Sequence, residues 1–183
     1  MGVNMGNQIE SGLSADKETA SIEFKENFDI SSSRDWCEII KDIIAIANTG
    51  GGVIVIGLND AGVPVGTDVN SLSNLDPADI TNKINKYTGY QFDQFKLKNC
   101  EKENYTLVAI QVESVSPPIV FEKPGTYDIG EGRQKTAFSA GTIYFRHGAK
   151  SEPGNTHDLQ KAFEKRLEIV REAWLQNVRQ VVE

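Results

Sequence analysis

The fold is decided by residues 39–62, which read IIKDIIAIANTGGGVIVIGLNDAG. The isoleucines in the first half continue a helical spacing that begins at Trp36, and the three serines at 31–33 offer N-caps before it. Glycines at 50–52 end this pattern, because glycine terminates helices readily. The apolar run at 53–56 is typical of a strand covered on both faces. We therefore expect a helix that leads directly into a buried strand.

Strands are predicted on both sides of this central unit. Ile22 and Phe24 alternate with charged residues, which predicts a strand from Ser21 with one face in water. After the turn at 59–62, Val63 and Val65 suggest a return strand.

The second half of the chain mixes helix and strand signals. Asp76 before Pro77 marks a short helix that ends near Gly89. Residues 90–98 and 105–112 bracket a polar stretch and predict an antiparallel hairpin. Residues 121–140 show no clear period and predict a loop, with or without a function, whereas residues 141–146 predict a further short strand. The expected fold class is α+β, with a mixed sheet and packed helices.

A long helix is predicted from Asn155 or Thr156 onward. Its apolar side chains form one stripe: Leu159, Phe163, Leu167, Val170, Trp174, Val178 and Val181. The stripe could pack on its own domain or on a partner. Because it could exceed what one small domain covers, we expect a homodimer that uses the distal half of this helix, around Trp174.

Composition narrows the class of protein. The chain has 183 residues, a formal net charge of −7 and only two cysteines, Cys37 and Cys100, which form neither a disulfide framework nor a metal-ligand spacing. No apolar run is long enough to cross a bilayer, so we expect a cytoplasmic protein with reduced thiols and no membrane partner. The acidic charge argues against bulk coating of DNA, because phosphate neutralisation by Lys and Arg dominates that kind of binding.

Basic residues are nevertheless concentrated in one later segment, at Arg133, Lys135, Arg146 and Lys150. Tyr144 and Arg146 should alternate outward from a short strand beside His147, and aromatic and cationic groups together suit base stacking and phosphate contact. The alternatives are a solvated surface of mixed charge or an edge strand protected by charges.

Four segments carry a resemblance to a known family. They are Glu18 and Glu23 with Phe24-Lys25, the helix that ends in the triple glycine, residues 55–62 (VIGLNDAG), and residues 143–148 (IYFRHG). In this order they resemble the Schlafen AlbA-type domain, over roughly residues 18–151. The resemblance implies a Schlafen AlbA-like fold and binding of DNA or RNA, with no cofactor required for binding. With the Gly-, Asn- and Ser-containing start of the chain and the apolar stripe near its end, we expect a flexible N-terminal arm (1–15), an AlbA-like domain (16–155) and a C-terminal helix (156–183) that packs on the domain or on a dimer partner.

Two branches of the family suggest more specific functions. Many bacterial members join the domain to a winged helix and are described as transcriptional regulators, but only one helix is predicted after Ser151 here. Some animal members are metal-dependent ribonucleases that use three acids, and the matching positions are Glu18, Glu23 and Asp60, with Lys25 as an auxiliary cation. Such a site would hold Mg²⁺ or Mn²⁺, because clustered carboxylates need a cation. However, Glu18 and Glu23 lie five residues apart, which in a continuous strand places them on opposite faces.

Three functions are therefore open from the sequence. The first is a nucleic-acid-binding module, and the second is a divalent-metal-dependent endoribonuclease acting on structured RNA. The third is a homo-oligomeric interaction protein without nucleic-acid binding, which the acidic net charge keeps under consideration.

Overall fold

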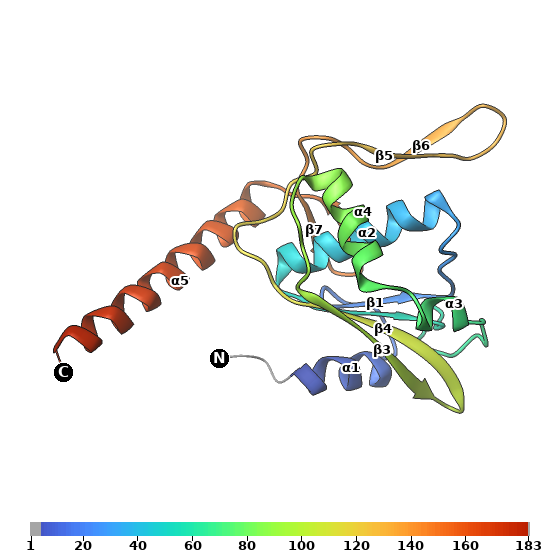
Figure 1. Cartoon of the computed structure of the whole chain (residues 1–183), viewed down its shortest axis with the longest axis horizontal. Coiled ribbons are helices and arrows are strands. Elements are labelled where there is room, and N and C mark those ends of the chain that lie inside the picture. The colour runs from blue at the N-terminus through green and yellow to red at the C-terminus, as the bar shows by residue number, and fades with distance from the viewer. Residues whose placement is uncertain (1–4, 183) are drawn as a thin grey trace.

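The computed structural model describes residues 5–182 and is built around one four-stranded mixed sheet (Figure 1). The strand order is β1-β2-β4-β3, with bounds Ile22–Lys25, Gly52–Ile56, Tyr105–Val112 and Phe95–Lys102, respectively. β1 runs parallel to β2, and the other neighbours are antiparallel. The expected α+β class with a mixed sheet is confirmed.

The central unit forms as the sequence predicts. Helix α2 spans Ser33–Thr49, its N-cap Ser32 accepts a hydrogen bond from the backbone N–H of Asp35, and Gly50 caps its C-terminus. Gly52 then starts β2 so close to β1 that a Cβ would lie 2.2 Å from the carbonyl oxygen of Ser21. Position 52 therefore requires glycine for a steric reason, because only a residue without a side chain permits this close approach.

Helices cover both faces of the sheet. α2 and α4 (Pro77–Thr88) pack on the face that carries Ile54, Ile56 and Ile110, whereas α1 (Met5–Ser14) packs on the face with Val53 and Val55. All five residues of β2 are buried, as expected for a strand covered on both sides. Asp76 caps α4 and Gly89 ends it in the left-handed conformation, which confirms the predicted short helix.

Several local expectations were wrong. Val63 and Val65 form no return strand; the segment makes one isolated bridge, between Leu58 and Pro64, since proline cannot donate a ladder hydrogen bond. Residues 121–140, expected as a loop, contain the hairpin of β5 (Gly125–Asp128) and β6 (Gln134–Phe138). β1 also has no fully wet face, because Glu23 is buried.

The two ends of the chain differ from one another. A flexible arm was expected over 1–15, of which residues 1–4 lie outside the described range. Residues 5–14 form α1, and Ile9 and Leu13, four residues apart, pack this helix on the sheet. At the other end, α5 (Thr156–Val182) projects away from the rest of the molecule (Figure 1). Within the described range, no helix has both the length and the apolar character that a bilayer span requires.

Candidate functional site

A buried ion network joins β1, α2 and the hairpin of β7 (Tyr144–His147) and β8 (Lys150–Pro153). The Arg146 guanidinium lies 2.6 Å from a Glu23 carboxylate oxygen and 4.0 Å from an oxygen of Asp42. Lys25 pairs with Glu23, and its Nζ lies 2.8 Å from Asp42. Ser151 donates to Asp42 at 2.7 Å and accepts from Arg146 at 3.2 Å. The Arg146 and Asp42 side chains are almost fully buried, so each charge needs the opposite charges of the network to offset its loss of hydration.

The pKa values of Glu23 and Lys25 are both shifted by this network. Burial and the neighbouring Asp42 raise the pKa of Glu23 to about 7, although Lys25 and Arg146 oppose the rise. Burial lowers the pKa of Lys25, but Asp42 and Glu23 outweigh it and raise that pKa above its ordinary value. The pKa of Glu23 therefore lies close to neutral pH.

The acidic trio suggested by the ribonuclease branch does not gather in one place. Glu18 accepts a hydrogen bond from the backbone N–H of Phe24 at 3.0 Å, and Glu23 is held by Lys25 and Arg146. Asp60 is exposed on its turn, which is closed by the side chain of Asn59 instead. Across residues 5–182, no three His, Cys, Asp or Glu side chains are arranged to hold a metal ion. The trio in this geometry therefore does not fit Mg²⁺ or Mn²⁺.

The residues of the predicted basic segment are separated by the fold. The expectation that Tyr144 and Arg146 face outward was wrong: both are buried, since β7 packs against α2 and the Tyr144 ring meets Phe121 edge to face. Arg133, on the β5–β6 turn, pairs with Glu131. Arg133, Lys135 and Lys150 are all exposed, but the first two lie on the β5–β6 hairpin and Lys150 lies at the start of β8.

Lys135 and Lys25 instead line a shallow depression of about 340 Å³ beside the N-terminal half of α2. Lys135 lies 3.6 Å from Glu38 and over the Tyr127 ring, whose hydroxyl donates to Glu38. Arg34 also lines this depression, together with the carboxylates of Asp35 and Glu38, so its cations lie beside acidic groups.

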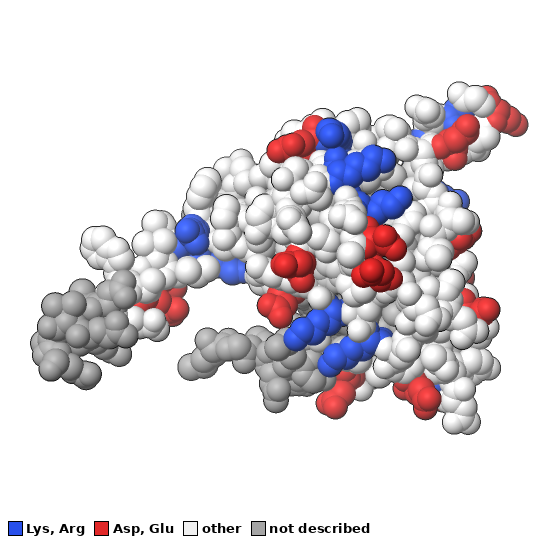
Figure 2. Space-filling view, in the orientation of Figure 1, with Lys and Arg blue, Asp and Glu red and all other residues white. Residues whose placement is uncertain are grey.

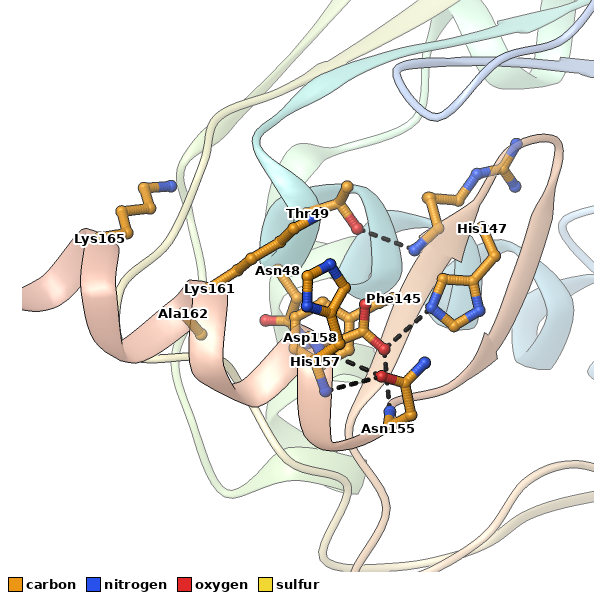
Figure 3. Close-up of a pocket in the computed structure, with 11 residues that line it drawn as sticks. Asn48, Thr49, Phe145, His147, Asn155, His157, Asp158, Lys161, Ala162 and Lys165 are labelled. Atoms are coloured by element: carbon orange, nitrogen blue, oxygen red, sulfur yellow. Dashed lines mark hydrogen bonds and ion pairs between the residues drawn. The ribbon is translucent and has the colours of Figure 1, made fainter.

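A second pocket, of about 320 Å³, lies where α5 leaves the body, and Lys161 and Lys165 are among its lining residues (Figure 3). We call it the α5 pocket. It is lined by Asn48 and Thr49 of α2, by residues 145–147 of β7, and by these residues at the start of α5: Asn155, His157, Asp158, Lys161, Ala162 and Lys165. The Asn48 side chain is held in place by three hydrogen bonds. Its amide nitrogen donates to the carbonyl oxygens of Ile119 and Tyr144, and its amide oxygen accepts from the backbone N–H of Ile119.

The α5 pocket presents a net positive lining. His157, Lys161 and Lys165 come from successive turns of α5 (Figure 3), and Lys165 donates to the hydroxyl of Ser114. The lining carboxylate, Asp158, accepts from the backbone N–H of Asn155 and lies 2.9 Å from the ring of His147. Hydrogen bonds to Asp158 and to Glu152 raise the pKa of His147, which favours its cationic form.

The wider surface has mixed charge. Figure 2 shows Lys and Arg side chains gathered over α4 and over β3, with acidic side chains between the groups. On this face no continuous basic stripe tracks across the described residues, so a nucleic acid has no extended path there.

The sequence contained a signal for the α5 pocket that the expectations missed. His157, Lys161 and Lys165 are spaced by four residues, which places them on one side of a helix. Of the predicted nucleic-acid residues, His147 lies in the pocket with its side chain partly exposed, and Lys150 faces His147 in the β7–β8 register. Asp42 was also missed, because it falls within an otherwise apolar helix pattern.

The chain was compared with known protein families and solved structures. A family model described as Schlafen, AlbA_2 matches residues 18–155. The DIP2311 protein from Corynebacterium diphtheriae has a similar structure at 17% identity, with a TM-score of 0.55 and coverage of 86% of this chain. Its match spans only 28% of the length of that protein.

A further solved structure is the N-terminal domain of an ATP-dependent DNA helicase RecG-related protein from Nitrosomonas europaea. It matches at 16% identity and a TM-score of 0.39, with coverage of 76% of this chain and 89% of that domain. No curated protein sequence matches the chain. The family model covers most of the chain and the whole central sheet, and the chain therefore belongs to the Schlafen, AlbA_2 family.

Proposed function

We propose that the chain binds nucleic acid, and that the α5 pocket holds its phosphate backbone. The observation that carries the proposal is the meeting of His157, Lys161 and Lys165 in one pocket of a chain with a net charge of −7. Family membership supports the same class of ligand. Binding of this kind needs local cations rather than a basic protein overall, because each phosphate contact releases condensed counterions.

The pocket offers phosphate two kinds of contact. Lys161 and Lys165 supply positive charge. The N-terminus of α5 adds the positive end of the helix dipole, although the Asn155 side chain accepts from the N–H groups of His157 and Asp158 there. Lys150 adds a further cation on the β7–β8 hairpin, opposite His147, whose ring nitrogens pair with Glu152 and Asp158. Neither Tyr144 nor Arg146 is available for stacking or phosphate contact, so we expect backbone recognition with little sequence preference.

Salt-dependent binding tests the proposal. Fluorescence anisotropy would follow labelled single-stranded RNA, hairpin RNA and duplex DNA over a salt series, for wild type and for Lys161→Ala with Lys165→Ala. Each lost phosphate contact should reduce the slope of log K against log salt by about 0.9 on duplex DNA or about 0.7 on a single strand. EDTA should leave binding unchanged, because the proposed contacts come from lysine side chains and not from a bound metal ion.

The matched control is Lys98→Ala, which removes an exposed lysine from β3. It should leave the slope within error of wild type. If the folded double variant keeps both the affinity and the slope of wild type, the α5 pocket does not bind the backbone. If wild type binds none of the three ligands, the chain does not act as a nucleic-acid-binding module.

A further inference from the structure

The outer face of α5 is apolar and has no partner among the described residues. Phe163 and Leu167 are each 68% exposed, Trp174 is 73% exposed and Val170 is 42% exposed. These residues follow one another at steps of four, three and four, which is the a/d spacing of a coiled-coil seam. The cations of the α5 pocket occupy other positions of the helix, so the seam and the pocket use different faces.

We infer that this seam pairs with the same seam of a second copy in an antiparallel coiled coil. The choice of a second copy rests on charge complementarity beside the seam. Glu164 and Arg171 occupy equivalent flanking positions, each one residue C-terminal to a seam residue. In an antiparallel pair these positions face one another, so Glu164 of each copy meets Arg171 of the other.

A parallel pair has the opposite electrostatics. Arg166 lies on the other flank of the seam, and in a parallel dimer it would face Arg171 of the second copy. A parallel dimer would contain two such arginine–arginine contacts, one on each side of the seam, and both would be repulsive. The flanking charges therefore select the antiparallel orientation.

The register follows from the same residues. Placing Phe163 opposite Trp174, and Leu167 opposite Val170, centres the two-fold axis between residues 168 and 169. That point also lies at the middle of α5, whose bounds are Thr156 and Val182, so the two helices overlap along their whole length of roughly 40 Å. The two bodies then lie at opposite ends of the helix pair.

Two features set the strength of the interaction. Glu164 accepts from Gln160 in its own helix, and Arg171 lies 3.8 Å from Glu168, so both exposed groups must exchange a local contact for the pairing. The apolar seam therefore supplies most of the affinity, and the charges supply the orientation. Ile169 and Leu175 are also exposed but fall outside the seam.

The first test is the mass in solution, measured by size-exclusion chromatography with light scattering at micromolar concentration. Wild type should be a dimer, and Trp174→Glu should be a monomer with an unchanged circular dichroism spectrum. Leu175→Glu is the matched control, because it places the same charge on a neighbouring exposed residue outside the seam, and it should remain a dimer. A monomeric wild type, or a dimeric Trp174→Glu, would overturn the inference.

Charge reversal tests the orientation. In the antiparallel pair, Glu164→Arg and Arg171→Glu should each raise the dissociation constant of the dimer by roughly fivefold, and the double reversal should restore it. In a parallel pair, Arg171→Glu would relieve repulsion from Arg166 and tighten the dimer. Tighter association of Arg171→Glu, or no rescue by the double reversal, contradicts the antiparallel seam.

Discussion

Replacement of Arg146 by alanine should destabilise the whole fold rather than weaken a surface contact. The side chain is almost fully buried, 2.6 Å from Glu23, and it also donates to the backbone carbonyl of Thr19 at 3.0 Å. Removing one partner of a buried ion pair costs about 3–5 kcal/mol when the other charge is left uncompensated. Lys25 still pairs with Glu23 and Asp42 after the loss of Arg146, so we expect a cost at the lower end of this range. A domain of this kind has a total stability of about 5–15 kcal/mol, so the loss removes a large share of it.

Urea denaturation measures this effect, with the fluorescence of buried Trp36 as the probe of folding. Lys150→Ala is the control, because Lys150 is exposed at the start of β8 and its loss should change the free energy of unfolding by no more than about 0.5 kcal/mol. A double-mutant cycle with Glu23→Gln should give a coupling energy of at least about 1 kcal/mol. The reasoning is refuted if Arg146→Ala unfolds at the same urea concentration as Lys150→Ala.

Three further outcomes follow from the structure. Because the pKa of Glu23 is raised to about 7, the folded chain holds this proton more tightly than the unfolded chain. The free energy of unfolding, measured by urea titration, should therefore fall as the pH rises from 4.5 to 7. Glu23→Gln should make this fall smaller. Gly52→Ala should abolish folding as judged by circular dichroism, since its Cβ would strike the backbone of Ser21, whereas Gly132→Asn, at an open left-handed position, should fold. Asp60→Asn should leave the melting temperature within a few degrees of wild type, because its side chain is exposed on the turn; a larger drop would give Asp60 a structural role that its contacts do not explain.

The central sheet and its main helices could be predicted because their signals are local. The helix periodicity before the triple glycine, the apolar run of β2 and the Asp76-Pro77 start of α4 each depend on neighbouring residues, and the structure contains all three. The β5–β6 hairpin was missed because Tyr127 and Phe138 are buried by contacts with distant elements, which the period of a Gly-rich polar segment does not reveal.

The candidate site was harder to predict because a charged residue can be either a surface group or a buried member of an ion pair, and the sequence does not distinguish the two. Arg146 in a short polar-looking strand suggested a surface cation, but its partners Glu23 and Asp42 come from β1 and α2. Only tertiary structure brings these three together. His157 and Lys161, by contrast, were visible as one helix face, but their importance depends on the neighbouring β7 strand that completes the pocket.

The histidine side chains provide the most direct test of nucleic-acid binding at the α5 pocket. The chain has two histidines, His147 and His157, and both line this pocket, so the imidazole signals in a ¹H–¹³C NMR spectrum report on it alone. Titration with a short single-stranded RNA should shift both signals along one saturating curve, with the same dissociation constant as anisotropy, and Lys161→Ala with Lys165→Ala should suppress the shifts. If the RNA binds while both histidine signals stay in place, the nucleic acid contacts another surface and the account is contradicted.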